Sequence, residues 1–309
     1  MKEPLFKGII SPMVTPLVGR DELDRGGLDR LVERLVNGGV HGIFILGTSG
    51  EAPSLSYHLR RELITRVCAL VGGKAPVLVG VSDTAFVESV NMAVHAADAG
   101  ASAVVLTAPY YFPADQAELI QYFEDIVPRL PLPVILYNMP EMTKTTLDIE
   151  TLRRLSSMEK ITGIKDSGGD IGYFGELVAL HRRRPDWSVL MGPEHLLVES
   201  LKLGGDGGVN GGSILFPRLL VQCYESAVSG DEKRTREIGE VMKIIHRLYE
   251  VGRHSSRVIK GVKCALSIMG VCDDFMAEPF HRFREPEREE IRNILEEVRN
   301  AMNESEALL

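Results

Sequence analysis

The sequence predicts a (β/α)8 barrel, or TIM barrel, followed by a C-terminal helical extension. Short apolar runs alternate with segments of helical periodicity, which is typical of βαβ units around a parallel sheet. Eight such runs recur at intervals of about 20 to 35 residues, as the strands of an eight-stranded barrel do. The predicted strands span residues 8–14, 42–46, 76–81, 103–107, 133–137, 161–165, 188–191 and 207–210.

The segments between the runs carry helix signals. In residues 28–36 the apolar positions fall on one helical face, and Gly38 and Gly39 follow as stop signals. Pro217 stands where the first turn of the eighth helix is expected, and Gly230 stands where that helix is expected to end. The barrel is therefore predicted to occupy residues 1–229.

Residues 230–309 are predicted to form the helical extension. Apolar positions recur at i, i+3 and i+4 through residues 238–249 and again through residues 291–302, and Pro286 opens the last helix. A doubly wound sheet also alternates strands and helices, but it normally has fewer strands and lacks an all-helical tail. The barrel is the better prediction.

Composition excludes several classes of protein. The chain has 309 residues, of which 44% are hydrophobic and 25% charged, so it can bury a large core. A net charge of -8 with interspersed signs offers no basic stripe for nucleic acid. The four cysteines are scattered, which argues against a disulfide framework, and no metal-ligand spacing is present among the histidines. We expect no metal.

The start of the chain lacks the basic patch and apolar run of a secretory signal, and no stretch approaches the roughly 20 apolar residues of a membrane span. A cytoplasmic location is expected.

Chemistry in a barrel is expected where the strands end, at their carboxyl side. Lys165 closes the apolar run 161–165, and an amine in a partly desolvated barrel mouth can attack a carbonyl carbon. By position alone, a rim lysine paired with a carboxylate is an equal alternative. Lys260 and Lys263 lie in a helical segment and are interpreted as structural.

Two further strand ends carry polar groups. Tyr137 closes the run 133–137, and its phenol can both donate and accept a proton, although an ordinary half-buried core tyrosine is the commoner role. The run 42–46 leads into the turn Gly47-Thr48-Ser49-Gly50-Glu51, whose N–H and hydroxyl groups suit a small carboxylate. Small polar residues are also what any such turn uses.

Four motifs together are more specific than each alone. They are GTSGE at 47–51, PYY at 109–111, YNMP at 137–140 and GIKDSGG at 163–169. In combination they resemble the dihydrodipicolinate synthase and N-acetylneuraminate lyase family, and the resemblance covers the whole chain. It implies a class I aldolase or lyase that makes or cleaves a carbon–carbon bond between pyruvate and an aldehyde.

The resemblance also implies roles for individual residues. Lys165 forms the imine with pyruvate, and Tyr137 transfers protons. Thr48 links the tyrosines, and Tyr111 completes the relay, in many members from an adjacent subunit. The keto-acid pocket is formed by the turn and a later strand end: Gly47, Thr48, Ser49 and Val209. The imine is the electron sink, so no cofactor is expected, and a homotetramer built as a dimer of dimers is expected.

Departures from the family pattern bear on the second substrate. Met142 stands where dihydrodipicolinate synthases carry an arginine that holds the carboxylate of the aldehyde, and a thioether cannot make that bond. Tyr57 and Arg60 stand where lysine-inhibited members have histidines. Both departures argue against lysine biosynthesis.

The segment GGDGGV at 204–209 resembles the sugar-acid branch of the family, but the polyol-binding positions of neuraminate lyases are changed. These changed positions are Glu194, His195, Gly211 and Gly212. The predicted substrate is therefore a 2-keto-3-deoxy sugar acid, or another hydroxylated aldehyde joined to pyruvate.

Alternatives stay open at this stage. Condensation of pyruvate with aspartate semialdehyde and cleavage of N-acetylneuraminate are two of them. The glycine-rich run 204–212 also fits a phosphate nest on a phosphosugar isomerase barrel, and a non-catalytic sensor could keep the keto-acid pocket. Neither of the last two explains Lys165 together with Tyr137.

Overall fold

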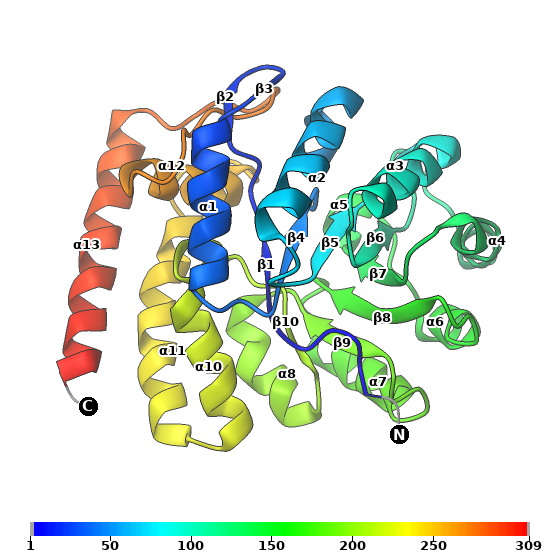
Figure 1. Ribbon diagram of the computed structural model, residues 1–309. Coiled ribbons are helices and arrows are strands. Elements are labelled where there is room, and N and C mark those ends of the chain that lie inside the picture. Colours follow the sequence, from blue (N-terminus) through cyan, green and yellow to red (C-terminus); the bar gives the residue numbers. More distant parts are fainter. Residues whose placement is uncertain (1–2, 308–309) are drawn as a thin grey trace.

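The computed structural model describes residues 3–307, with side chains described through residue 302. Eight parallel strands of the described chain close into a barrel, in the order β1-β10-β9-β8-β7-β6-β5-β4, and β4 pairs back to β1 (Figure 1). The predicted barrel and the places of its strands are confirmed. The strands are β1 (Gly8–Pro12), β4 (Gly42–Ile45), β5 (Val77–Gly80), β6 (Ala103–Thr107), β7 (Val134–Asn138), β8 (Ile161–Asp166), β9 (Ser188–Met191) and β10 (Gly207–Gly208).

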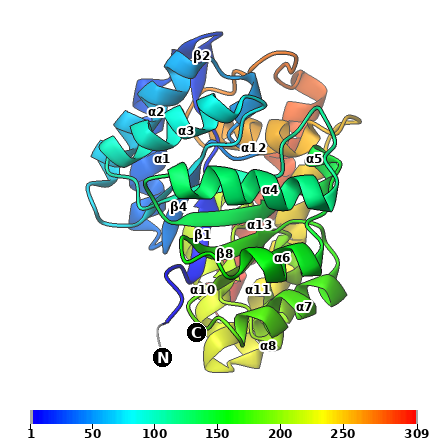
Figure 2. The same cartoon turned by 90° about the vertical axis from the view of Figure 1, so that its right-hand side faces the viewer.

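Helices cover the outside of the barrel (Figures 1 and 2). Local sequence sets several of their ends: the Asp24 side chain accepts the N–H of Gly27 at the start of α1, and Asp115 with Glu118 forms a capping box at α4. Pro217 begins α10, and Gly230 ends it in the left-handed conformation, as predicted. The covering helices are α1 (Arg25–Asn37), α2 (Tyr57–Val71), α3 (Phe86–Asp98), α4 (Gln116–Ile126), α6 (Ile149–Leu155), α7 (Ile171–His181), α8 (Leu197–Leu203) and α10 (Pro217–Ser229).

Short elements that the sequence pattern did not predict lie in the loops. Several of them directly follow a barrel strand, where they shape the mouth of the barrel. They are β2 (Leu17–Gly19), β3 (Glu22–Leu23), η1 (Ala52–Ser54), η2 (Val127–Arg129), α5 (Pro140–Thr143), η3 (Glu194–Leu196), α9 (Gly212–Leu215) and η4 (Arg247–Tyr249).

Two apolar clusters form the core. The barrel interior cluster is small and includes Phe44, Tyr137, Leu190 and Val209. The larger cluster lies between the strands and the covering helices and continues into the extension. Because side chains alternate along a strand, six of the barrel strands contribute to both clusters, which explains why these strands read as continuous apolar runs. They are β1, β4, β5, β6, β7 and β9.

The extension consists of α11 (Glu232–His246), α12 (Arg257–Ile268) and α13 (Glu285–Ala307). Figure 1 shows α13 running along α11, and Figure 2 shows α12 at the same end of the barrel as α5. The division into units 1–229 and 230–309 stays a prediction, and residues 1, 2, 308 and 309 lie outside the described residues.

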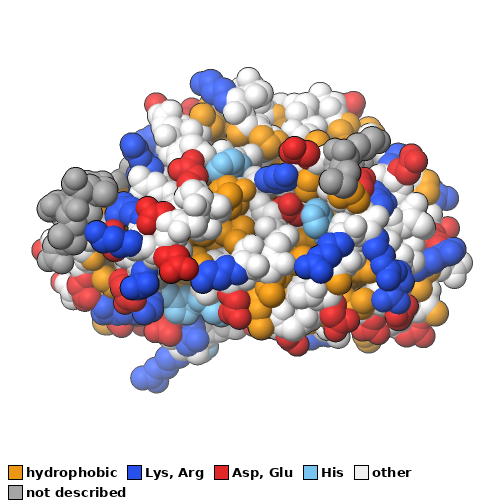
Figure 3. All heavy atoms as spheres, turned by 90° about the horizontal axis from the view of Figure 1, so that it is seen from below, with side chains coloured by type: hydrophobic (Ala, Val, Ile, Leu, Met, Phe, Trp, Pro, Cys, Tyr) orange, Lys and Arg blue, Asp and Glu red, His pale blue; other side chains and the backbone are white. Residues whose placement is uncertain are grey.

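The surface carries both signs of charge. On the face seen in Figure 3, Lys and Arg side chains are interspersed with Asp and Glu side chains rather than gathered into one stripe. In the described part of the chain, no helix has both the length and the apolar character needed to span a membrane.

Candidate active site

Tyr137 and Lys165 are the penultimate residues of the neighbouring strands β7 and β8 and lie opposite each other. β7 and β8 pair with Tyr137 beside Lys165 and Asn138 beside Asp166. Because successive side chains point to opposite faces of a strand, the first pair faces the barrel interior and the second faces outward. Nζ of Lys165 lies 4.0 Å from the centroid of the Tyr137 ring and 5.2 Å from that of Phe44. The two residues that carry the predicted chemistry are in contact.

The outward pair fixes the ends of the same strands. Nδ2 of Asn138 donates to Oδ1 of Asp166 over 2.8 Å, and Oδ1 of Asn138 accepts the N–H of Leu147 over 3.0 Å. The N–H of Gly168 also donates to Asp166, over 3.1 Å. Burial raises the pKa of the Asp166 carboxyl, although the hydrogen bonds from Asn138 and Gly168 oppose the shift. Asn138 and Asp166 are not among the predicted site residues, yet each directly follows one.

The hydroxyl of Tyr137 connects Lys165 to the turn after β4. It lies 3.4 Å from Oγ1 of Thr48, and either hydroxyl can donate. Burial raises the pKa of the phenol, but the positive charge of Lys165 and hydrogen bonds, including those to Thr48 and Ser167, lower it by more. The pKa of Tyr137 therefore lies below its ordinary value. Such a phenol releases its proton more readily, as a proton relay requires.

The turn at residues 47–51 presents backbone donors beside this pair. Among the described residues, neither the N–H of Thr48 nor that of Ser49 donates to a backbone acceptor, whereas the next two N–H groups turn back onto the carbonyls of Gly47 and Thr48. A Cβ at Gly47 would lie 2.6 Å from the ring of Phe44, so the turn needs glycine there. Two successive unpaired N–H groups in a tight turn suit a carboxylate.

The last residue of the turn is tied to the helical extension. Glu51 has a φ of 56°, in the left-handed region, and its carboxylate forms a buried ion pair with Lys263 of α12. Oε2 of Glu51 also accepts the N–H of Ala277 over 2.9 Å, and Nζ of Lys263 donates to the carbonyl of Phe275 over 2.7 Å. Burial lowers the pKa of Lys263, and the charge of Glu51 opposes that shift. Lys263 thus joins the extension to the turn.

A cavity of about 340 Å³ is bordered by the turn and by Tyr137. Its volume lies at the low end of the roughly 300–1,000 Å³ typical of small-molecule sites, so it suits a small substrate. In the described chain, Glu51 is the one charged residue of the lining, and Lys263 pairs with it. The extension contributes four lining residues that the sequence pattern did not single out: Ser255, Ser256, Ile259 and Phe280.

The predicted substrate-binding residues divide into two groups. Ser49 lies in the turn but outside the lining, and Val209 is buried in the barrel interior cluster with Tyr137. Lys165 is 6% exposed and also lies outside the lining, with its Nζ in contact with the ring of Tyr137, which does line the cavity. Four predicted site residues line the cavity directly: Gly47, Thr48, Tyr137 and Met142.

Tyr111 lies outside the cavity of its own chain. Its side chain is 84% exposed, its φ is 83°, and its ring packs edge-on against Phe112 at a centroid distance of 5.0 Å. Tyr110 lines the cavity instead, and burial followed by the charge of Asp83 raises the pKa of its phenol. The reach of Tyr111 into a neighbouring subunit stays a prediction.

A buried ion pair stands near Tyr110. NH1 of Arg60 donates to Oδ2 of Asp83 over 3.0 Å, and the hydroxyl of Tyr57 lies 3.2 Å from both oxygens of the same carboxylate. The Arg60 guanidinium also lies 5.0 Å from the centroid of the Tyr57 ring. The two residues that depart from the lysine-inhibited pattern therefore complete one polar network rather than leaving a gap.

Glu194 and His195 do not reach the cavity. Oε2 of Glu194 accepts the N–H of Gly212 over 2.5 Å and the hydroxyl of Tyr249 over 3.2 Å, which ties η3 to α9 and to the extension. Burial raises the pKa of Glu194 to about 7, although both hydrogen bonds oppose the shift. His195 is exposed, with its ring centroid 6.0 Å from that of His246. Glu194 therefore has a structural role in this chain, because it links η3 to α9 and to the extension.

Solved structures share this architecture. A dihydrodipicolinate synthase from Bacteroides thetaiotaomicron is 48% identical, with a TM-score of 0.92 over 96% of this chain and 100% of that one. YagE from Escherichia coli K12, solved in complex with pyruvate, is 28% identical, with a TM-score of 0.90 over 96% of this chain and 99% of that one.

Sequence comparison agrees. An uncharacterised DapA-like lyase of Halobacterium salinarum is 32% identical over 269 residues, which are 87% of this chain and 86% of that protein. The curated name of YagE is putative 2-dehydro-3-deoxy-D-gluconate aldolase. The model of the dihydrodipicolinate synthetase family matches residues 5–298. With the lysine and tyrosine paired at the ends of β8 and β7, the predicted family of pyruvate-dependent lyases is confirmed, and the chain belongs to the dihydrodipicolinate synthetase family.

Proposed function

We propose that this protein is a class I aldolase in which Lys165 binds pyruvate covalently. The observation that carries the proposal is the contact between Nζ of Lys165 and the ring of Tyr137 at the mouth of the barrel. Nζ attacks the keto carbon, the keto oxygen leaves as water, and a protonated imine remains. The imine is the electron sink, so the proposal requires neither a metal nor a cofactor.

Tyr137 and Thr48 move the protons of the reaction. Loss of a proton from the methyl carbon of the imine gives an enamine, and this carbon forms the new bond to the aldehyde carbon. The aldehyde oxygen takes up a proton and becomes a hydroxyl group. Tyr137 is suited to these transfers because its hydroxyl lies 3.4 Å from Oγ1 of Thr48 and its pKa is lowered. Hydrolysis of the imine then releases the product.

The keto-acid carboxylate is assigned to the turn at residues 47–51. The unpaired N–H groups of Thr48 and Ser49 are available to it, and the hydroxyl of Thr48 stands beside Tyr137. Val209 packs below, in the barrel interior cluster. This arrangement leaves the methyl carbon of pyruvate free to face the cavity.

The aldehyde partner is assigned an uncharged tail. Among the described lining residues none is Lys, Arg or His, and Met142 offers no charged donor to a second carboxylate. A 2-keto-3-deoxy sugar acid fits this condition, and YagE carries the name of such an aldolase. Aspartate semialdehyde is the second candidate, because the 48% identical Bacteroides structure is described as a dihydrodipicolinate synthase.

We also propose an oligomer, a homotetramer built as a dimer of dimers. Tyr111 and Phe112 are 84% and 77% exposed, and large exposed aromatic side chains favour a protein interface. In that assembly Tyr111 would complete the proton relay of the neighbouring site.

Borohydride reduction tests the covalent step. Treatment with pyruvate and borohydride should add one reduced pyruvate to Lys165, identified by peptide mass spectrometry. Lys165→Ala should gain no adduct and should show no turnover, whereas Lys144→Gln, at an exposed lysine near Met142, should behave as the wild type. An adduct on another lysine, or turnover by Lys165→Ala, would overturn the proposal.

A further inference from the structure

Ser256 lines the active-site cavity with a buried hydroxyl group that has no protein partner. The residue is 5% exposed and belongs to the same lining as Thr48 and Tyr137. It stands at the N-cap of α12, yet its side chain accepts none of the N–H groups of that helix. Within the described chain its hydroxyl makes no other hydrogen bond. A buried hydroxyl without a partner is costly, so this one calls for a partner on a ligand.

The other hydroxyl groups of the lining differ from that of Ser256. Ser54 and Ser255 are exposed, so water can satisfy their hydrogen bonds. Among the described lining residues, Tyr137 and Thr143 also carry buried hydroxyl groups, but both have partners, at 3.4 Å and 2.9 Å. Ser256 is therefore the buried hydroxyl of this lining that the protein leaves unused.

The first turn of α12 adds backbone donors beside Ser256. The N–H groups of Arg257 and Lys260 donate to backbone carbonyls over 2.9 Å and 3.0 Å. Between them, the N–H groups of Val258 and Ile259 have no acceptor among the described residues. Because α12 has 12 residues, its start carries a partial positive charge that favours an oxygen ligand.

Contacts place this end of α12 at the mouth of the barrel. Ser256, Ile259 and Lys263 follow one another at spacings of three and four, so they share one face of the helix. Ile259 lines the cavity, and Lys263 forms the buried ion pair with Glu51. Glu51 is the last residue of the turn at residues 47–51, to which the carboxylate of pyruvate is assigned. The face of α12 that carries Ser256 is thus the face that meets the active-site turn.

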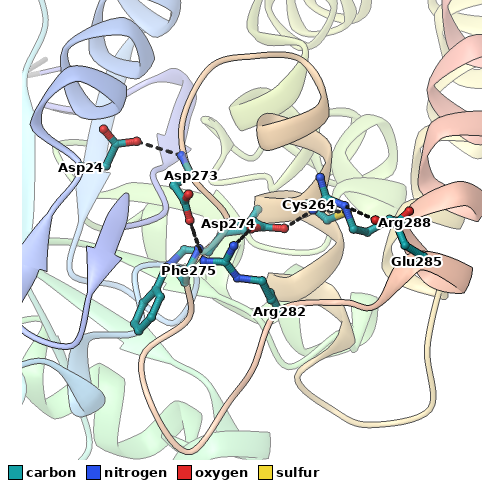
Figure 4. Close-up of polar contacts among 9 residues, drawn as sticks. Asp24, Cys264, Asp273, Asp274, Phe275, Arg282, Glu285 and Arg288 are labelled. Carbon is teal, nitrogen blue, oxygen red and sulfur yellow. Dashed lines mark hydrogen bonds and ion pairs between the residues drawn. The ribbon is translucent and has the colours of Figure 1, made fainter.

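The segment that follows α12 anchors the helix (Figure 4). NH1 of Arg288 lies 3.8 Å from Sγ of Cys264 in α12, and Arg288 also pairs with Asp274. The N–H of Asp273 donates to Asp24 over 2.8 Å, at the start of α1. Contacts to α1, to α13 and to the turn therefore hold α12 in its place beside the cavity.

Ser256 meets the part of the cavity that is remote from the turn. Lys263, which contacts the turn, follows Ser256 by seven residues, and an α-helix rises about 1.5 Å per residue. The start of α12 thus lies roughly 10 Å along the helix axis from the contact with the turn. The part of a substrate that reaches Ser256 is accordingly the end of its tail, not the carbon atoms next to Lys165.

We infer that Ser256 and the first turn of α12 bind a hydroxyl group at the end of the aldehyde tail, and that they select aldehydes with a terminal hydroxymethyl group. The inference rests on the proposed function, because the cavity receives a tail only if Lys165 holds pyruvate. A hydroxyl group can accept a helix N–H and donate to Oγ of Ser256, whereas a carboxylate can only accept. A carboxylate would also share the described lining with Glu51, its one charged residue.

A matched pair of aldehydes tests the inference. Glyceraldehyde carries a hydroxyl group on its terminal carbon, and lactaldehyde lacks that group. For both enantiomers of each, kcat/KM is measured for aldol addition with pyruvate. We expect the better glyceraldehyde enantiomer to exceed the better lactaldehyde enantiomer by about 10-fold or more. A ratio at or below one would overturn the inference.

Variants at Ser256 locate the effect. Ser256→Ala should lower the ratio by about 3- to 10-fold, through a lower kcat/KM for glyceraldehyde alone. The substitution removes no capping hydrogen bond, and Ser256→Gly, with a residue that also suits an N-cap, is a second variant with the same expectation. Ser267→Ala is the matched control, because Ser267 belongs to the same helix but does not line the cavity. An unchanged ratio in a Ser256 variant that still forms the pyruvate adduct would contradict the role of Ser256.

Aspartate semialdehyde distinguishes a hydroxyl subsite from a carboxylate subsite. Its tail ends in a carboxylate, so Ser256→Ala should leave its kcat/KM at the wild-type level. A loss with this substrate and an unchanged glyceraldehyde to lactaldehyde ratio would make the subsite a carboxylate site and the inference wrong.

The two levels of the proposal fail separately. Absence of the Lys165 adduct in the wild type contradicts the proposed function itself. A normal adduct with a glyceraldehyde to lactaldehyde ratio at or below one contradicts only the hydroxyl subsite.

Discussion

Nζ of Lys165 lies 4.0 Å from the centroid of the Tyr137 ring because the two residues are partners in the register of β7 and β8. The next residues along both strands, Asn138 and Asp166, are joined by a hydrogen bond of 2.8 Å on the opposite face. The outward pair therefore adds a side-chain hydrogen bond to the strand register that brings Lys165 beside Tyr137. This coupling makes the chemistry depend on backbone register, which is among the most rigid features of a barrel.

Replacing Tyr137 by Phe tests the proton relay. The hydroxyl is lost while the ring that contacts Lys165 remains, so we expect kcat to fall by about 10²-fold or more with a small change in KM. The lowered pKa of Tyr137 also predicts that one limb of the wild-type pH–rate profile is missing in the variant. Steady-state kinetics across pH measures both. A change confined to KM would make Tyr137 a binding residue.

The sequence alone predicts what depends on local pattern. Lys165 and Tyr137 could be found because each closes an apolar run, and strand ends meet at one face of a barrel. Asn138 and Asp166 carried a weaker signal, since each follows a predicted site residue but points away from the cavity. Only the pairing of the strands shows that they hydrogen-bond to each other.

Contacts distant in sequence could not be predicted. Ile259 and Phe280 reach the cavity through the packing of the extension, and neither stands at a strand end or in a recognisable motif. Lys263 is interpreted from the sequence as a structural helix residue, but only folding shows that its partner is the buried carboxylate of Glu51. Glu194 occupies a position of expected substrate contact, yet the burial of Tyr249 beside it gives it a structural partner. Periodicity reports only which face of an element is apolar.

Breaking the buried ion pair of Glu51 and Lys263 should destabilise the fold. Lys263→Met leaves a buried carboxylate without its partner, which typically costs about 3 to 5 kcal/mol. The double variant Glu51→Gln, Lys263→Met should recover much of that loss, because no isolated charge remains. Lys243→Met, which breaks the exposed pair with Glu240, should change stability by about 1 kcal/mol or less. Equilibrium denaturation in urea measures all three, and equal effects for the two single variants would contradict the assignment.

The buried carboxyl of Glu194 should make stability depend on pH. Burial raises its pKa from the ordinary value of 4.5 to about 7, so the folded protein keeps this proton where the unfolded chain has released it. Its stabilising contribution is complete below about pH 4.5 and is lost as pH rises to about 7. The loss is on the order of 3 kcal/mol.

Glu194→Gln keeps an acceptor for Gly212 and Tyr249 but cannot ionise, so it should remove this decline. The free energy of unfolding of both proteins, measured from about pH 5 to about pH 8, provides the test. Glu199→Gln, at an exposed position of α8, is the control and should keep the wild-type slope. Parallel pH curves for Glu194→Gln and the wild type would show that Glu194 stays ionised in the fold.

Mixing two inactive variants tests the shared site. If Tyr111 completes the site of a neighbouring subunit, hybrids of Lys165→Ala and Tyr111→Phe contain one site with both an intact lysine and an intact tyrosine. Random reassembly should then restore up to about a quarter of the wild-type activity. Each variant alone, taken through the same dissociation and reassembly, is the control. No recovery in mixtures that sedimentation shows to be hybrid would place Tyr111 outside the neighbour's site.

Met142 should decide between the two candidate substrates. Its thioether gives no anchor for a second carboxylate, so condensation of pyruvate with aspartate semialdehyde should be poor, whereas a 2-keto-3-deoxy acid with an uncharged tail should be cleaved. A charged hydrogen bond contributes about 1.5 to 3 kcal/mol, so the expected penalty in kcat/KM is on the order of 10- to 100-fold. Met142→Arg should therefore recover part of the semialdehyde reaction.

The same substitution adds a guanidinium to a lining that otherwise holds no Lys, Arg or His among the described residues, and it should depress cleavage of the uncharged substrate. Met142→Leu keeps the apolar surface and is the matched control, with both reactions near the wild-type rate. Measuring kcat/KM for both substrates in all three proteins separates a charge effect from a packing effect. Efficient condensation with aspartate semialdehyde by the wild type would mean that another cation, such as the exposed Lys144, anchors the carboxylate, and it would favour the synthase as the function of this chain.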